Sequence, residues 1–452
     1  MQKKKVDRSN YLFSNQALVA LIIPLIIEQF LAVLVGMADS IMIASVGEAA
    51  VSGVSLVDQV MVLLINVFAA LATGGAVVAG QYLGQNNRAG ACRSATQLVW
   101  FIGICAVVIS AIVYLGKSFI LHGVFGQIEP DVMQHANTYL MIVAASIPFI
   151  AIYNGGAAIF RAMGNSKVSM KVSIIMNLIN VVGNATLIYG FHCGTEGVAI
   201  PTLVSRMVAA IIIVALLCNK KQMLHIYPTF HYRFQWREVR KILMIGVPNG
   251  LENSMFQLGK ILVLSLVSTF GTYAIAANAV SNAIALFQIL PGMAMGLAIT
   301  TVISRCVGYG DYEQVKYYTK KLMIITNVGL AIMILIIYAL LPVILWAYQL
   351  SDQTAQVARD IITFHGISAI FVWTLSFSLP NVFRAAGDTK ACMVISIISM
   401  WVFRIGFSYL LGGHLGMGVF GVWVAMVIDW IFRAICFVIR YFVGSWKKKA
   451  IV

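Results

Sequence analysis

Hydrophobic positions along this chain form long unbroken runs, separated by short polar stretches, from about residue 17 to about residue 443. A bilayer-spanning helix needs roughly 20 apolar residues, and each run reaches that length. In lipid the backbone N–H and C=O groups find partners only within the chain, so continuous helices are expected. The pattern predicts twelve transmembrane helices, at 17–42, 51–79, 94–116, 136–160, 168–190, 197–218, 240–268, 275–304, 321–347, 359–383, 391–412 and 418–442.

Composition agrees with an all-α integral membrane protein. Hydrophobic residues make up 60% of the chain, charged residues make up 10%, and the mean hydropathy is +0.90. A soluble protein has about 25% charged residues, so a large soluble protein is excluded. The seven cysteines include no CxxC pair and no Cys/His cluster, so neither a structural zinc site nor a disulfide framework is expected.

The net charge of +15 is explained by the distribution of Lys and Arg over the predicted loops. One side of the predicted membrane protein collects 25 of the 31 basic residues, and the other side has two. By the positive-inside rule both termini and the even-numbered loops lie in the cytoplasm, which predicts a multi-pass protein of the cell membrane. Nucleic acid binding is not needed to explain the charge. The remaining four basic residues lie within predicted spans: Arg206, Lys260, Arg404 and Arg433.

The second half of the sequence repeats the first half at a constant offset. With this offset Pro24, Glu28, Gly47 and Gly84 fall on Pro248, Glu252, Gly271 and Gly308 without a gap. The repeat predicts two six-helix lobes, 1–218 and 240–452, joined by a basic cytoplasmic linker at 219–239. Because six is even, both lobes begin on the same side and are related by a pseudo-twofold axis along the membrane normal. Such repeats are typical of transporters, although a duplicated scaffold without a transport role is the alternative.

Charged and amide side chains inside the first half are candidate functional groups, since ionisable residues within a membrane usually face a cavity or a partner. The spacing from Glu28 to Asp39 is close to three helical turns, so the two carboxylates share a face of the first span. Asn177, Asn180 and Asn184 lie on one stripe of the fifth span. Together with Asp39 they would form a set of oxygen ligands for a proton or a hard monovalent cation. The alternatives are interhelical hydrogen bonding for the amides and a water-exposed helix end for Asp39.

In the second half, a polar stripe follows the seventh predicted span. Asn253, Gln257 and Lys260 have i, i+4, i+7 spacing, and Glu252 flanks them. Lys260 has three possible partners at this stage: Glu252, Glu28, or Gln257 with water. Structural and functional roles both remain open for Glu28 and Glu252. Asp429 and Arg433, at i, i+4, are predicted to neutralise each other.

No nucleotide-binding or hydrolytic motif occurs, because GxxxxGK[ST], HExxH and GxSxG are all absent from the sequence. Transport would therefore draw its energy from an ion gradient. Moving one charge through 100 mV supplies about 2.3 kcal/mol, and one pH unit supplies about 1.4 kcal/mol. The chain is predicted not to be an enzyme and to need no cofactor.

Several motifs, in this order and spacing, resemble the multidrug and toxic compound extrusion (MATE) family over nearly the whole chain. They are GMADSIMIASVG (36–47), GQYLGQNNRAGA (80–91), FRAMGNSK (160–167), GVAIPT (197–202), IGVPNGLEN (245–253) and FRAAGDTK (383–390). The resemblance implies two lobes forming a V that opens alternately to the two sides of the membrane. It also implies export of small organic compounds, often cationic, coupled to entry of H⁺ or Na⁺.

The resemblance also implies an ion-coupling set in the first lobe, consisting of Asp39, Asn180, Asn184 and Thr202, which would also be the metal ligands if the ion is Na⁺. Many relatives have Asp where this chain has Asn184, so protonation of Asp39 is an alternative to sodium binding. Other family members use acidic residues of span ten, but residues 364–383 contain none. Residues Glu28, Asn177, Glu252, Asn253, Gln257 and Lys260 are assigned to the substrate cavity or to gating.

The function predicted from sequence is therefore secondary active efflux of small, cationic or amphiphilic organic compounds by a monomer in contact with membrane lipids. One alternative is a lipid-linked precursor flippase of the same superfamily, which would have a more cationic central cleft. Another alternative is a membrane sensor or enzyme, although no clustered catalytic set is visible. Lys260 departs from the family pattern; it would either favour anionic or zwitterionic cargo or act as a tethered cation that is released when the cleft closes.

Overall fold

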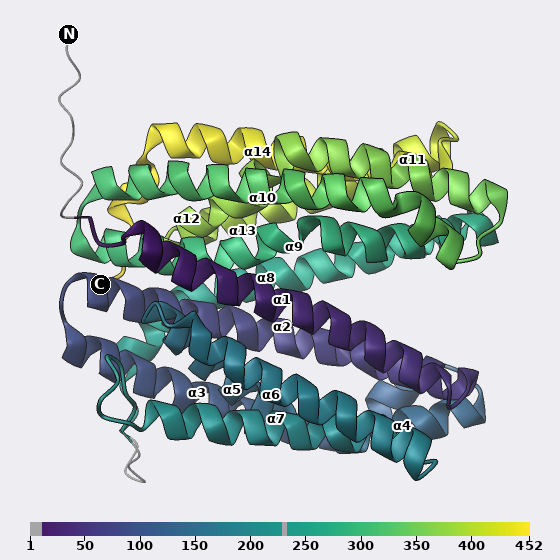
Figure 1. The fold of residues 1–452 in the computed structure, drawn as a ribbon, viewed down its shortest axis with the longest axis horizontal. Helices are drawn as coiled ribbons and strands as arrows, with labels where there is room; N and C mark the ends of the chain where they lie inside the picture. The colour runs from purple at the N-terminus through teal and green to yellow at the C-terminus, as the bar shows by residue number, and fades with distance from the viewer. Residues whose placement is uncertain (1–10, 228–232) are drawn as a thin grey trace.

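The computed structural model describes residues 11–227 and 233–452, and these residues form helices joined by short turns, with no strand among them (Figure 1). The α-helices are α1 (Asn15–Ala44), α2 (Glu48–Gly84), α3 (Arg88–Leu115), α4 (Pro130–Ala144), α5 (Ile147–Ala162), α6 (Ser166–Ala185), α7 (Glu196–Leu217), α8 (Trp236–Ser268), α9 (Thr272–Tyr309), α10 (Tyr312–Ala347), α11 (Asp352–Ser368), α12 (Leu379–Ala385), α13 (Thr389–Ile398) and α14 (Gly418–Val443). Five π-helical segments are η1 (Phe119–Val124), η2 (Thr186–Gly190), η3 (Ala369–Ser378), η4 (Ser399–Gly406) and η5 (Ser408–His414), and η6 (Ser445–Lys448) is a 3₁₀ helix.

Each predicted span coincides with one helix or with a run of consecutive helical pieces. Within the described residues, ten helices are long and apolar enough to cross a membrane, and the pair α4 and α5, bent by 48°, makes up to eleven. The chain is thus a multi-pass membrane protein. Helix α8 has 33 residues but is not among these spans, because Glu252, Asn253, Gln257 and Lys260 lower its mean hydropathy. The seventh predicted span, 240–268, therefore stays a prediction, and with it the total of twelve.

Two groups of helices are visible in Figure 1, with α2–α7 on one side and α9–α14 on the other. The groups approach each other at the closed end, where α1 begins and the C-terminus lies, and they diverge towards the end where α1 finishes. Helices from the two groups pack directly against each other, since α2 contacts α9. Helix α1 also contacts both groups, through α6 and α9, and α8 contacts α2.

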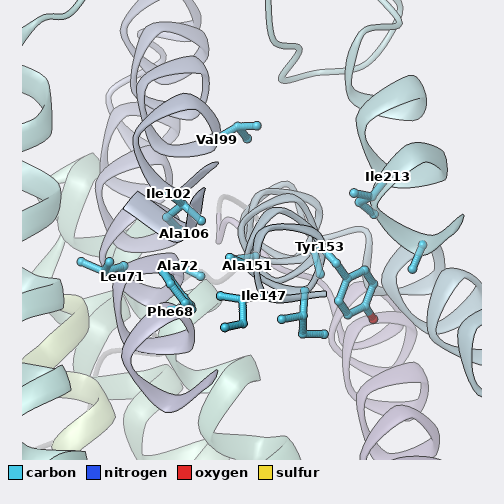
Figure 2. Packing of buried hydrophobic residues seen from close by; sticks show 14 of the residues in the cluster. Phe68, Leu71, Ala72, Val99, Ile102, Ala106, Ile147, Ala151, Tyr153 and Ile213 are labelled. Carbon is cyan, nitrogen blue, oxygen red and sulfur yellow. The ribbon is translucent and has the colours of Figure 1, made fainter. Parts of the chain in front are cut away.

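Apolar side chains fill the interior of each group. Around α2, α3 and α5, for example, Phe68, Ile102 and Ile147 belong to one apolar cluster (Figure 2) and are at most 1% exposed. Residues 228–232 of the predicted linker, and the basic residues Lys3, Lys4, Lys5 and Arg8 counted above, lie outside the described residues. All seven cysteines are free.

Glycines matched by the repeat have corresponding roles in the two halves. Gly47 and Gly271 precede α2 and α9 with φ of 142° and 103°, a conformation that favours glycine. At the closed end α2 and α9 cross with their backbones in contact. A Cβ atom on Gly84 would overlap the Arg305 carbonyl oxygen, and one on Gly308 would overlap that of Gln81. Both positions therefore require glycine for a packing reason.

We expect Gly308→Ala to destabilise the protein, because the added methyl forces the α2 and α9 backbones apart. Overpacking of this kind costs about 1–3 kcal/mol, which exceeds the gain of about 1 kcal/mol in helix propensity. Gly103→Ala is the matched control, since its Cβ would meet only Ile152 at 3.6 Å. Thermal unfolding of the purified variants measures the difference. A Gly308→Ala protein as stable as Gly103→Ala would contradict the contact.

A second connection at the closed end involves Gln81. Its amide nitrogen donates to the Ala385 carbonyl at 2.9 Å, and its amide oxygen accepts from the backbone N–H groups of Ile451 and Val452 at 3.0 and 3.2 Å. Gln81 is fully buried. One side chain of α2 thus joins α12 and the C-terminal residues, which closes this end of the molecule.

Candidate functional site

The carboxylate of Asp39 meets two amides and a hydroxyl from α6 and α7. The side-chain nitrogen of Asn184 donates to Asp39 Oδ1 at 2.7 Å, and the Asn180 amide lies between Asp39 and Thr202. Asn180, Asn184 and Thr202 are at most 7% exposed, whereas Asp39 is half-buried. The structure thus brings together the four residues predicted for ion coupling, although they lie on three helices and far apart in the sequence.

The orientation of the Asn180 amide follows from its two neighbours. Its nitrogen donates to Asp39 Oδ1 at 2.9 Å, and its oxygen accepts from the Thr202 hydroxyl at 3.1 Å. The opposite orientation would set the amide oxygen against the carboxylate oxygens, so the bare carboxylate fixes the amide in this one. The buried Asn184 Oδ1 has no hydrogen-bond partner and is available to a bound ion.

A second carboxylate, Asp58 on α2, acts electrostatically on Asp39 and was not predicted. It accepts a hydrogen bond from the Tyr139 hydroxyl at 2.9 Å. Arg206 on α7, which donates to Ser146 Oγ at 2.8 Å, acts on both carboxylates. The sequence signal for Asp58 was an acidic residue inside the second apolar run. Asp58 gives the region a second carboxylate.

Asn177 is not part of this group. Its amide donates to Ser173 Oγ at 3.4 Å on the same helix. Of the three predicted amides, Asn180 and Asn184 therefore contact Asp39, and Asn177 does not. Among the described residues, no group of three His, Cys, Asp or Glu side chains could hold a metal ion. Any ion near Asp39 would therefore be bound by one or two carboxylates together with amide and hydroxyl oxygens, a donor set suited to H⁺ or to a hard monovalent cation.

Glu28 and Glu252 both form ion pairs with arginines of the repeated FRA motif. Glu28 lies 3.5 Å from Arg161 Nη1 and accepts from Ser169 Oγ at 2.9 Å. Both oxygens of Glu252 accept from Arg384 Nη2 at 2.8 Å. The two halves thus share both the Glu and Arg residues and the ion pair that these residues form. A structural role explains both glutamates without assigning an ion to either.

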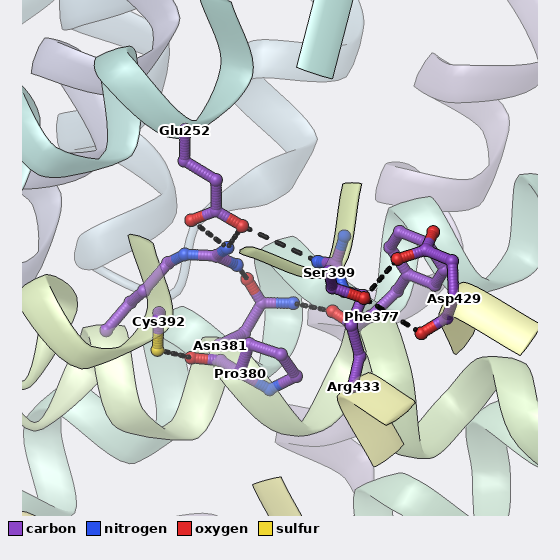
Figure 3. A network of polar contacts seen from close by, with 9 residues as sticks. Glu252, Phe377, Pro380, Asn381, Cys392, Ser399, Asp429 and Arg433 are labelled. Carbon is purple, nitrogen blue, oxygen red and sulfur yellow. Dashed lines mark hydrogen bonds and ion pairs between the residues drawn. The ribbon is translucent and has the colours of Figure 1, made fainter. Parts of the chain in front are cut away.

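The predicted neutralisation of Arg433 by Asp429 is wrong. Arg433 lies 3.5 Å from Glu252 and approaches the face of Phe377, whereas Asp429 accepts a hydrogen bond from Ser399 (Figure 3). The i, i+4 spacing permits a pair on one helix, but the carboxylate of Glu252 on α8 already binds Arg384 and attracts the second guanidinium. Glu252 therefore lies at the centre of a three-residue charge cluster.

Lys260 forms no ion pair with Glu252, Glu28 or any other described carboxylate. Its ammonium lies 5.0 Å from the ring centroid of Phe256, and Arg404 approaches the same ring at 5.2 Å. Of the partners considered from sequence, the two glutamates are therefore excluded. Gln257 and Lys260 are not among the lining residues of the central cavity, whereas Asn253 is.

A cavity of about 340 Å³ lies where the two groups of helices meet. Its lining includes Asn249, Asn253, Asn381, Trp373, Arg161 and Arg384. Met293 lines both this cavity and a larger, mainly apolar one of about 860 Å³ between α1, α9 and α10, which includes Phe287 and Tyr348. A pocket with apolar walls and a few polar groups is suited to small organic molecules.

These features define a class: a polytopic membrane protein with an internal repeat, a cavity between its halves and an acidic cluster inside the membrane, as transporters have. The MatE family model matches residues 24–186 and 248–410, so the chain belongs to the MATE family, whose members are transporters rather than enzymes. The two matched ranges are equally long and begin at Pro24 and Pro248, the pair aligned by the repeat, which confirms the predicted repeat. MATE transporters need no cofactor.

Relatives and solved structures agree with this assignment. The chain is 27% identical to "Uncharacterized transporter YisQ" of Bacillus subtilis, with 99% of this chain and 97% of that protein aligned. It is 24% identical to "Probable multidrug resistance protein NorM" of Thermotoga maritima, over 97% and 94% of the two chains. A multidrug resistance MATE transporter solved in an outward-facing conformation superposes with a TM-score of 0.88 at 20% identity, over 96% of each chain.

Proposed function

We propose that this protein is a secondary active exporter of small amphiphilic organic compounds, an antiporter that couples their efflux to entry of H⁺ or Na⁺. The observation that carries the proposal is the Asp39 cluster, in which a half-buried carboxylate accepts from the Asn184 amide at 2.7 Å and from the Asn180 amide at 2.9 Å. Such a group binds an ion in one state and releases it in another. A positive charge on the cargo, as the family resemblance implies, is part of this proposal.

The proposed architecture has twelve transmembrane helices in two six-helix lobes, residues 1–218 and 240–452, joined by a cytoplasmic linker at 219–239. The diverging helix groups of Figure 1 support it. Alternating access would require the contact between α2 and α9 at Gly84 and Gly308 to open when the other end closes. We place the protein as a monomer in the cell membrane with both termini in the cytoplasm, on the basis of the Lys and Arg distribution.

Binding of the coupling ion would act mainly within the first lobe. Protonation of Asp39 allows it to donate to the Asn180 oxygen, whereas the charged form prefers the Asn180 nitrogen. Because Asn180 also contacts Thr202 on α7, a change at Asp39 passes to the packing of α1 against α6 and α7. The shape of the cavity between the lobes would change with it.

Reconstituted vesicles test the coupling. We expect efflux of a fluorescent amphiphile against its gradient when either an inward H⁺ gradient or an inward Na⁺ gradient is imposed, and none without a gradient. One unit of pH or about 60 mV supplies about 1.4 kcal/mol per proton or charge, enough for about tenfold accumulation. Separate proton and sodium gradients identify the ion. Equal flux with collapsed gradients would refute antiport.

A further inference from the structure

Basic side chains exceed acidic ones in the interior of the second half. Within the part of the chain that the structure describes, two carboxylates, Glu252 and Asp429, act on the four interior cations Arg384, Arg404, Arg433 and Lys260. Glu252 already binds two of the arginines, and Asp429 accepts from Ser399. Arg384 and Arg433 are 12% and 3% exposed, so their charges belong to the interior. Four cations against two carboxylates leave two positive charges in excess. Asp429 acts on Arg404, whereas no described carboxylate acts on Lys260, whose charged neighbour is Arg404.

Lys260 and Arg404 lie close together on α8 and η4. The Lys260 ammonium lies 5.0 Å and the Arg404 guanidinium 5.2 Å from the ring centroid of Phe256. The sum of these two distances is therefore the upper limit of the separation between the two charged groups. The helical segments touch at Gly259, where a Cβ would overlap Met400 Cε, so the separation cannot easily increase. Two like charges held this close repel each other unless an anion lies near both.

Hydrogen-bond donors are also in excess around these residues. Among the described residues, four buried donor nitrogens of this region have no acceptor: Arg384 Nε, Arg404 Nε, Arg433 Nε and Trp430 Nε1. Apart from hydroxyl groups, the one carboxylate oxygen left without a donor here is Asp429 Oδ2. Buried polar groups are normally satisfied. A ligand that brings acceptor oxygens and a negative charge to Lys260 and Arg404 would give Arg404 Nε an acceptor and offset the excess charge of the pair.

Lys260 lies two helical turns from a residue that lines the central cavity. Lys260 is exposed and Arg404 is half-buried, and the polar stripe of α8 leads from Lys260 through Gln257 to Asn253, which lines the central cavity. A lysine within an apolar span is costly unless it faces water or a partner. One aromatic ring does not satisfy two cations, because cation–π attraction is weak compared with a charge-assisted hydrogen bond.

We propose that Lys260 and Arg404 bind an acidic group of the transported compound, a carboxylate, sulfonate or phosphate, in a molecule that also carries a positive charge. This assignment rests on the proposed export function and deepens it by naming a substrate class. Arg404 supplies a planar fork of donors that matches two oxygens of such a group, and Lys260 supplies a point charge. The acidic cluster at Asp39 and this basic pair would then hold opposite charges in the two halves.

Equilibrium binding to the purified full chain tests the site independently of transport. The probes are rhodamine B, which carries a free carboxylate, and its ethyl ester, which has the same cationic ring system without it. We expect the wild type to bind the acid at least tenfold more tightly than the ester, measured by fluorescence anisotropy. In Lys260→Gln/Arg404→Gln we expect the affinity for the acid to fall about tenfold to a hundredfold and the affinity for the ester to stay unchanged.

Two control variants are available. Lys260→Arg/Arg404→Lys keeps both charges and should retain most of the preference for the acid. Lys316→Gln removes an exposed lysine elsewhere and should retain the full preference. Repeating the titrations in chloride, phosphate and gluconate separates the two sources of an anion. Ester binding that requires chloride or phosphate in the wild type, and not in the double Gln variant, would assign the pair to a free inorganic anion and overturn the proposal.

Equal wild-type affinity for acid and ester, or unchanged acid binding by the folded double Gln variant, would also overturn it. If the double Gln variant does not fold, the charge-conserving variant and the acid-to-ester ratio of the wild type still decide. Failure of the export function is seen separately, as the absence of gradient-driven efflux of either dye from wild-type vesicles.

Discussion

Replacing Asp39 with Asn should reduce gradient-driven efflux to the level of protein-free vesicles while the protein still folds. Asparagine has nearly the same shape and can hydrogen-bond to Asn180 and Asn184, but it neither takes up a proton nor carries the charge that attracts a cation. The loss should therefore be specific to coupling. Efflux from vesicles under H⁺ and Na⁺ gradients measures it, with thermal unfolding as the check on folding.

Asp352→Asn is the matched control, because Asp352 is exposed at the start of α11 and should leave efflux unchanged. Asp58→Asn provides the decisive comparison. If the Asp39 variant transports normally and the Asp58 variant does not, the coupling carboxylate is Asp58, and the assignment of Asp39 is wrong. Normal transport by both variants would remove the acidic cluster from the mechanism.

Arg384→Gln should be the most destabilising single change among the charged residues. It leaves Glu252, which is 6% exposed, with only Arg433 at 3.5 Å. Breaking a buried ion pair by removing one partner costs about 3–5 kcal/mol. Glu252 would lose both of its 2.8 Å hydrogen bonds from Arg384, and Arg433 at 3.5 Å compensates the charge only in part. The apparent unfolding temperature of the purified protein, followed by intrinsic fluorescence, measures the effect.

Lys316→Gln is the control, since Lys316 and Glu313 form a 2.6 Å pair whose side chains are 45% and 76% exposed. Such surface pairs contribute about 0–1 kcal/mol. The double variant Glu252→Gln/Arg384→Gln should be less stable than Arg384→Gln alone, because it also leaves the buried Arg433 without its carboxylate partner. A destabilisation no larger than that of Lys316→Gln would mean that water reaches Glu252.

The internal repeat explains why Asp39→Asn is expected to affect transport and Arg384→Gln to affect stability. Glu28–Arg161 and Glu252–Arg384 occur in both halves, as expected for elements that hold each half together. Asp39 has no acidic counterpart, since Val263 stands at the matching position. The second half has Lys260 and Arg404 instead. The two halves therefore share a scaffold and differ in the charge they present.

Long apolar runs and the constant offset between the halves were enough to predict the helices, their order and the repeat, because span length and backbone hydrogen bonding in lipid leave few alternatives. Asp39, Asn180 and Asn184 were also recognisable, since a polar residue in an apolar span is conspicuous. The partners of charged side chains were not predictable. Arg433 pairs with Glu252 on another helix and not with Asp429, which lies one helical turn away on its own helix. Asp58 on α2 acts electrostatically on Asp39 on α1. Such pairings depend on how helices pack in three dimensions, which local spacing does not specify.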